Sequence, residues 1–324
     1  MNTPFRCMCA TALMAIFLSG IGLSTAARGD YFLGVTDSTN DVIKIDPVTG
    51  HGVKISSNAA NSEDIQTDSQ GNLIIVSNVP GISTSASFRT TFQQLDPITF
   101  VPTVLATAYN YRFVEGLANV NGVLYGSAST LDSYAPDTSD HLIRIDLATK
   151  TFTEVGKFGS AFQNMEDLAY SPKYGLYGVD IGTLDPGTGF HTFHTTPALV
   201  KIDINTGIAT KIADLPPSSV DLVSNPNNHI LSPYGPYLCG LDFSPDGTLY
   251  ATTFPTHFSG ESHLVTIDPM TGAVTEIGDI GFQGIDGIIY VRTVPEPASL
   301  GLVACGIVVF GVARWCRSRS MKCL

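Results

Sequence analysis

Residues 240–250 read GLDFSPDGTLY, and residues 267–272 read IDPMTG. The first string places a Pro-Asp-Gly turn between two short runs of alternating apolar and polar residues, which is typical of a β-hairpin. The second string places Asp at the start of a turn, where its carboxylate can accept backbone N–H groups, and ends it with Gly, which tolerates a positive φ. Together the two strings predict four antiparallel strands joined by tight turns.

The turn that begins with Ile-Asp or Leu-Asp recurs along the chain. Its five copies are 45–50, 95–99, 145–149, 202–207 and 267–272. Each copy follows a run with the period of two expected of a half-buried strand, and a second short strand comes after it. Hairpins similar to 240–250 lie upstream of other copies, at 64–74, 115–125 and 167–177. The repeating unit is therefore four strands within about fifty residues.

Four-stranded units at this spacing resemble the blades of bacterial β-propeller repeat proteins. The first copy begins at Tyr31 and lacks the first strand of the unit, whereas a spare strand of that type, 283–287, follows the last copy. Pairing of this strand with the first copy would close the ring. We therefore expect an all-β fold, a β-propeller of five four-stranded antiparallel blades. Six blades are the alternative, if 288–291 forms a strand of its own.

The C-terminal segment 294–324 has three parts in a fixed order. The first is a Pro-Glu-Pro motif, formed by Val294, Pro295, Glu296 and Pro297. The second is one apolar segment, 298–315. The third is a basic tail, formed by Arg314, Arg317 and Arg319 with Lys322. This order resembles the PEP-CTERM sorting signal of Gram-negative bacteria, which implies processing by an exosortase-type membrane protease. The apolar segment is long enough for a transmembrane helix, and the basic residues predict a cytoplasmic end. The alternative is a C-terminal anchor that is never cut.

The N-terminal segment 1–27 has the order of a secretory signal peptide. Arg6 precedes an apolar stretch at 10–23, and small residues follow it at 24–27. We therefore expect a mature domain at 28–293 that crosses the inner membrane, is transiently anchored there and ends at the cell surface or outside the cell.

Composition limits the disulfides that the mature domain can form and the classes of partner that it can bind. Cys239 is its one cysteine, so the domain cannot hold an internal disulfide. Residues 28–294 contain twelve Lys and Arg against twenty-eight Asp and Glu, a net charge of −16. Such a surface repels nucleic acid and anionic lipid, and it attracts divalent cations or basic partners.

Alignment of the repeats places five residues at one position, at the start of the innermost strand. They are Glu63, Glu115, Glu166, Cys239 and Gln283. We expect them at the mouth of the central channel, where carboxylates could bind a cation such as Ca²⁺ or supply acid and base groups. Alternatively, they line a wet channel or hydrogen-bond to the backbone of the next blade.

The long connections between predicted strands fall on one face of the propeller. They are 77–91, 127–140, 180–197, 215–238 and 252–262. Long surface loops on a rigid scaffold commonly carry binding sites. We therefore predict an exported, non-catalytic propeller that binds a glycan, such as an extracellular polysaccharide, or another exported protein through this face. The alternative is a secreted polysaccharide hydrolase or lyase, or a lactonase-like enzyme, that uses the carboxylates at the channel mouth.

Overall fold

A computed structural model of the chain describes residues 29–36, 39–79, 89–130, 140–181, 197–215, 237–254 and 261–293. Residues Asp30–Val291 form one compact unit. The predicted signal peptide, the Pro-Glu-Pro motif and the predicted membrane segment 298–315 lie outside the described residues. Within the described ranges, we find no helix long and apolar enough to cross a membrane.

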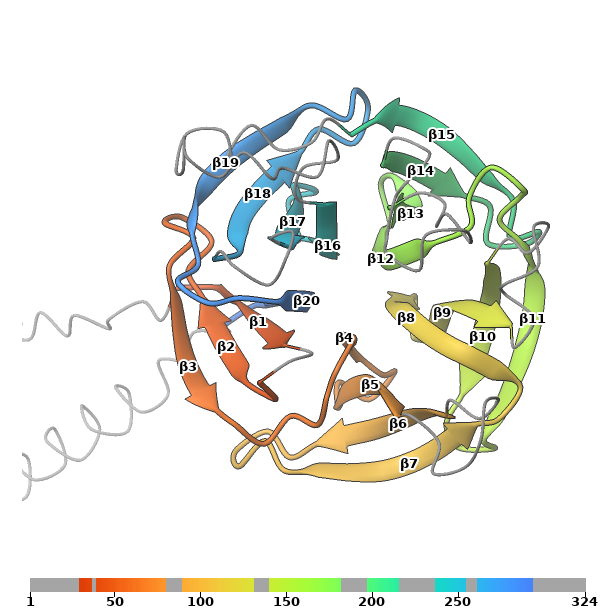
Figure 1. Ribbon diagram of the computed structural model, residues 1–324, viewed down its shortest axis with the longest axis horizontal. Coiled ribbons are helices and arrows are strands. Elements are labelled where there is room, and N and C mark those ends of the chain that lie inside the picture. The colour runs from red at the N-terminus through yellow and green to blue at the C-terminus, as the bar shows by residue number, and fades with distance from the viewer. Residues whose placement is uncertain are drawn as a thin grey trace, which may run out of the picture. The chain divides into compact units, whose positions relative to one another are not determined.

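The described residues contain twenty strands, which form five four-stranded antiparallel sheets around one axis (Figure 1). The chain is thus a five-bladed β-propeller, as the repeat predicted. From the innermost to the outermost strand, the first blade is β20 (Ile285–Val291), β1 (Tyr31–Thr36), β2 (Val42–Ile45) and β3 (Gly52–Ser56); the second is β4 (Asp64–Thr67), β5 (Leu73–Val79), β6 (Arg89–Leu95) and β7 (Pro102–Ala108); the third is β8 (Tyr111–Val120), β9 (Val123–Thr130), β10 (His141–Asp146) and β11 (Thr151–Lys157); the fourth is β12 (Met165–Ser171), β13 (Gly175–Asp180), β14 (Ala198–Ile202) and β15 (Ala209–Asp214); the fifth is β16 (Tyr237–Phe243), β17 (Leu249–Phe254), β18 (His263–Ile267) and β19 (Val274–Asp279).

The two ends of the propeller domain meet in the first blade. β20 pairs with β1 in a register that runs from Tyr31 opposite Val291 to Thr36 opposite Ile285. The C-terminal strand therefore supplies the strand that the first repeat lacks, as predicted. Because 288–291 belong to this same strand and pair with β1, they form no separate blade, and the six-blade alternative is wrong.

The five Asp turns share one hydrogen bond. The carboxylate Oδ1 of each Asp accepts the backbone N–H two residues further on, at 2.8–3.0 Å; the residues are Asp46, Asp96, Asp146, Asp203 and Asp268. The fifth turn position has a positive φ even where no Gly stands there, at Phe100 and Lys150, with φ of 56° in both. The turn geometry thus follows the Asp cap, and Gly only makes it less costly.

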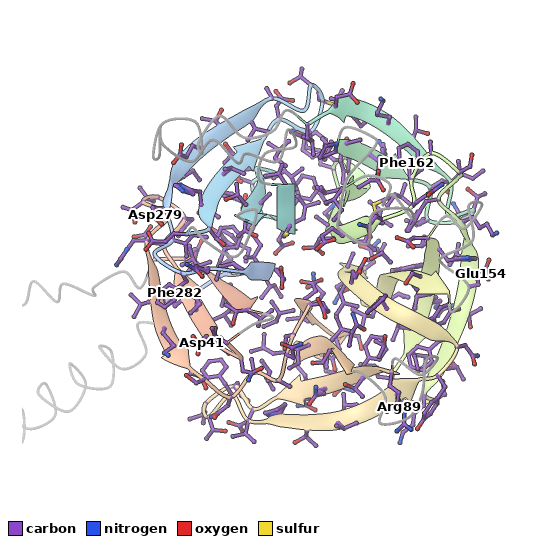
Figure 2. All side chains as sticks on the ribbon, in the orientation of Figure 1. Asp41, Arg89, Glu154, Phe162, Asp279 and Phe282 are labelled. Carbon is purple, nitrogen blue, oxygen red and sulfur yellow. The ribbon has the colours of Figure 1, made fainter. Side chains whose placement is uncertain are left out.

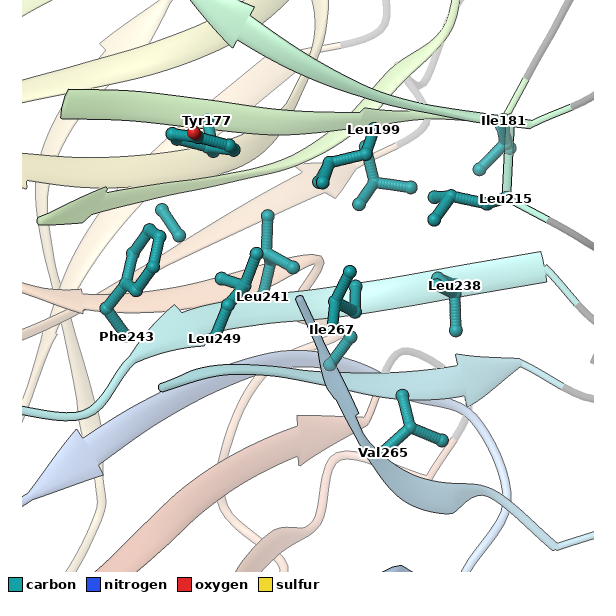
Figure 3. Packing of buried hydrophobic residues seen from close by; sticks show 13 residues of the cluster. Tyr177, Ile181, Leu199, Leu215, Leu238, Leu241, Phe243, Leu249, Val265 and Ile267 are labelled. Atoms are coloured by element: carbon teal, nitrogen blue, oxygen red, sulfur yellow. The ribbon is translucent and has the colours of Figure 1, made fainter. Parts of the chain in front are cut away.

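Apolar side chains fill the seams between neighbouring blades. Figure 3 shows one of five such clusters, in which Tyr177 and Leu199 of the fourth blade face Leu241 and Leu249 of the fifth. All four side chains are buried. Because each seam joins residues of two blades, truncation of one such Leu to Ala is expected to cost about 2–5 kcal/mol. The blades therefore depend on one another for their cores.

The Asp turns also seal the seams at the rim. The turn of the fourth blade ends at Gly207, whose φ is +75°, and it lies against the outer strand of the third blade. A Cβ at Gly207 would come within 2.6 Å of the Gly156 carbonyl oxygen. Gly is therefore required there both by the backbone conformation and by the neighbouring blade.

We expect Gly207→Ala to lower the free energy of unfolding by more than about 1 kcal/mol, because it adds a clash to an unfavourable φ. The matched control is Gly71→Ala, where φ is +81° and nothing lies within 4 Å of the added Cβ. Denaturant unfolding followed by far-ultraviolet circular dichroism measures the free energy of unfolding of both variants. Equal losses in the two variants would contradict the docking of the turn on the third blade.

Candidate functional site

The inner strands contain an irregularity near their starts. In β8, β12, β16 and β20 the pairing with the next strand shifts by one residue. Such a β-bulge inserts an extra residue and redirects its side chain, and bulges are frequent beside functional sites. The residues within these shifts are Glu115, Glu166, Cys239 and Asp286. In the second blade, Glu63 directly precedes β4 and donates its N–H to the Val76 carbonyl at 2.9 Å.

These residues come together although each belongs to a different blade. One ligand atom each of Glu166, Cys239 and Asp286 lies within 4.8 Å of the other two. The Cys239 thiol donates to Glu166 Oε1 at 3.8 Å. Burial raises the pKa of Glu115 well above its usual range, and the charges of Glu166, Asp140 and Glu63 raise it further. We call the set Glu63, Glu115, Glu166, Cys239 and Asp286 the axial ring; Figure 2 shows side chains of all five blades surrounding the axis.

The fifth member of the axial ring differs from the sequence prediction. Gln283 was aligned with Glu63, but it is exposed and precedes β20. The register places Ile288 opposite Gly34, as it places Leu168 opposite Gly178. Asp286 therefore occupies the predicted position of Gln283. The sequence does contain a signal for this placement of Asp286. Asp286 is followed by Gly and an aliphatic residue, as Glu115 is.

A second layer of residues follows the axial ring along the inner strands. Its members are Asp64, Gly116, Asp167, Gly240 and Gly287. Asp64 Oδ2 accepts the Leu117 N–H of the next blade at 2.6 Å, and Asp167 accepts the Leu241 N–H in the same way. Both carboxyls are buried, which raises the pKa of each well above its usual range, and the charge of Asp64 raises the pKa of Asp167 further. This layer joins the blades and is structural.

Two further buried carboxyls hold neighbouring inner strands. Asp140 Oδ2 accepts the Met165 N–H at 2.8 Å, and Asp242 Oδ2 accepts the Tyr290 N–H at 2.6 Å. Burial raises the pKa of Asp140 to about 8, with a smaller contribution from the charge of Asp180, and it raises the pKa of Asp242 to about 7. Sequence reasoning missed both roles, because each bond joins residues of different repeats.

We expect the free energy of unfolding to fall as pH rises from about 4 towards 8. Asp140 keeps its proton in the folded state up to about pH 8 but loses it near pH 4 when unfolded, so the folded state binds more protons between these limits. One such group contributes up to about 1.4 kcal/mol per pH unit. Urea unfolding at a series of pH values measures the slope.

The variant Asp140→Asn cannot ionise, and its amide oxygen can still accept the Met165 N–H, so we expect a shallower fall between pH 5 and 8. The exposed Asp214, changed to Asn, is the control and should keep the wild-type slope. If the free energy of unfolding of Asp140→Asn fell with pH as steeply as that of the wild type, the proton on Asp140 would not stabilise the fold.

The predicted long connections attach at the same end of the blades as the axial ring. Leu238 near the start of β16 lies opposite Thr253 near the end of β17, which places the start of the inner strand beside the connection to β18. The outer parts of these segments belong to strands, since β5 extends to Val79 and β6 begins at Arg89. Their central parts, 80–88, 131–139, 182–196, 216–236 and 255–260, lie outside the described residues.

Known proteins that resemble this chain are found among solved structures. No family model matches the sequence, and no curated protein matches it. Among solved structures, TolB from Acinetobacter baumannii is similar, with 12% identity and a TM-score of 0.41 over 85% of this chain and 60% of TolB. The periplasmic gluconolactonase of Pseudomonas aeruginosa has 12% identity and a TM-score of 0.39 over 81% and 99% of the two chains. An oligogalacturonate lyase solved with manganese has 12% identity and a TM-score of 0.36 over 74% and 59%.

Proposed function

We propose that this protein is an exported, ligand-binding propeller whose axial ring holds a divalent cation on the face that carries the long connections. One observation carries the proposal: Glu63, Glu115, Glu166 and Asp286 hold equivalent positions in four blades, and ligand atoms of Glu166 and Asp286 lie within 4.8 Å of one another and of the Cys239 thiol. A glycan or a protein partner would bind on this face, where sugar hydroxyl or carboxylate groups can complete the coordination of the cation.

The donor atoms fit Ca²⁺ best. Carboxylate oxygens are its preferred ligands, and it takes six to eight of them in flexible geometry. The fifth position carries the Cys239 thiol, and thiolates prefer softer ions such as Zn²⁺. Because Cys239 is buried and donates to Glu166, we assign the coordinating role to the carboxylates. A comparison of Ca²⁺ with Zn²⁺ therefore tests which donors matter.

We expect Ca²⁺ to raise the melting temperature by about 5–10 °C at a hundredfold excess over its Kd, because it binds only the folded ring. Glu115→Gln should abolish most of this shift. Glu154→Gln, which changes an exposed Glu on β11 of the same blade, should leave it intact. Differential scanning fluorimetry measures the shift, and isothermal titration gives the stoichiometry.

No shift in the wild type, or the same shift in Glu115→Gln, would contradict the cation site.

A second candidate function is a lactonase or polysaccharide lyase. It is favoured by the raised pKa of Glu115, since a carboxyl whose pKa lies above its usual range is better suited to act as a general acid. Turnover of a lactone or uronate substrate that is lost in Glu115→Gln, without any calcium dependence of the melting temperature, would support that candidate instead.

We also propose that the two terminal segments direct export and processing of the chain. Recognition by an exosortase-type protease at Val294–297 would release the propeller from the inner membrane to the cell surface. We expect the wild-type protein recovered outside the cell to lack the residues after this motif. Alanine at both Pro295 and Pro297 should leave the chain at full length and in the membrane fraction.

Mass spectrometry of the C-terminal peptide in fractionated cells distinguishes the two forms. The neighbouring change Thr293→Ala is the control, and it should be processed as the wild type is. A full-length wild-type protein that stays in the membrane would indicate a permanent anchor.

A further inference from the structure

Both ends of the propeller domain leave from the same end of the first blade. Tyr31, at the start of β1, pairs with Val291, at the end of β20. The Tyr290 hydroxyl donates to Asp30 Oδ2 at 3.0 Å, which holds the beginning of the domain beside its last strand. Because β1 and β20 are antiparallel, the chain enters this blade and leaves it at one end.

This end is opposite to the axial ring. Asp286 of the axial ring is the second residue of β20, whereas Val291 is its last. Phe32 lies opposite Ile45, directly before the turn at Asp46, so both ends leave beside an Asp turn. In each blade the Asp turn joins the third and fourth strands, at the end opposite to the start of the innermost strand. The propeller therefore has a ring face, with the axial ring and the long connections, and a turn face, with the Asp turns and both ends of the domain.

The connection from the turn face to the predicted membrane segment is short. Six residues, 292–297, separate Val291 from the segment 298–315. Fully extended, this connection spans at most about 25 Å, at about 3.3–3.6 Å per residue. With 298–315 in the bilayer, Val291 stays within about 25 Å of the membrane surface.

The ring face is too far from the end of β20 for this connection to bring it to the bilayer. The connection would first have to cross the turn face from β20, at the axis, past β1 and β2 to β3, at the rim (Figure 1). That path is about 14 Å at a strand spacing of about 4.8 Å. It would then have to follow the blade to the ring face, which is about 23 Å for a strand as long as β20. The whole path is longer than the reach of six residues.

We propose that this short connection holds the anchored propeller with its turn face towards the inner membrane and its ring face away from it. The proposal rests on the membrane anchor of the proposed function. The axial ring then stays accessible to a cation and a ligand before processing. The protease, in turn, must reach the Pro-Glu-Pro motif in a gap of at most about 25 Å between the turn face and the bilayer.

Fluorescence energy transfer to a lipid that carries an acceptor on its headgroup compares the distances of the two faces from the bilayer. Asn61 and Gln70 are exposed and flank β4, the first on the ring face and the second on the turn face. With the full-length chain in phosphatidylcholine vesicles, we expect transfer from a dye on Gln70→Cys to exceed that from Asn61→Cys at least about twofold. The reason is that the two positions lie about 20 Å apart along the strand.

For this measurement the cysteines outside the propeller are changed to Ser, so that the dye reacts at one position. Cys239 is buried and can stay. A longer connection is the matched control. An insertion of about twenty Gly and Ser residues after Thr293 is flexible and lets either face approach the bilayer. We expect it to abolish the difference between the two dyes, and circular dichroism checks that each variant is folded.

Flotation of the vesicles separates this proposal from the anchor on which it rests. A chain that does not float with the vesicles would contradict the anchor, and the orientation with it. A chain that floats but gives equal or stronger transfer from Asn61→Cys would overturn the orientation alone. A difference that the insertion leaves unchanged would also overturn it, because the length of the connection would then not set the orientation.

Discussion

The structure depends on how closely neighbouring inner strands approach one another at the axis. At Gly116 an added Cβ would lie 2.5 Å from the Asp167 Cα, and at Gly240 it would lie 2.9 Å from the Asp286 carbonyl oxygen. Where the position carries Asp instead, as at Asp64 and Asp167, the carboxylate accepts a backbone N–H of the next blade. Each seam at the axis is therefore either a close backbone approach or a carboxylate bridge.

The same constraint creates the axial ring. In four of the five blades the residue before the close contact lies within a β-bulge, and bulges commonly redirect a side chain. Because the inner strands are near one another, carboxylates at this position are forced into proximity, and their burial and mutual repulsion favour the protonated form. A cation would replace the proton as the compensating charge. The residues that join the blades, such as Asp64, are thus direct neighbours of the residues proposed to bind a ligand, such as Glu63.

The difference between prediction and structure at Gln283 has a clear physical cause. The segment 283–289 contains Gly twice, at Gly284 and Gly287, and each is followed by Ile. Local similarity to the other repeats cannot choose between these two alignments. The pairing with β1 decides, because only the second alignment lets the full strand Ile285–Val291 pair while Ile288 faces Gly34. Asp140 was missed for a related reason, since its partner Met165 belongs to the next blade.

The sequence by itself determined the local structure and predicted five blades, and the pairing of β20 with β1 excluded the sixth. Alternating strands, Asp turns and hairpin signals depend on residues within a few positions of one another, so they can be read from one repeat and counted along the chain. Only the tertiary structure decided which side chains meet at the axis. Cys239 and Glu166 are 73 residues apart, and Asp64 and Leu117 are 53 apart. Their contacts depend on the register of each inner strand and on the closure of the ring, and a shift of one residue in a strand exchanges its two faces.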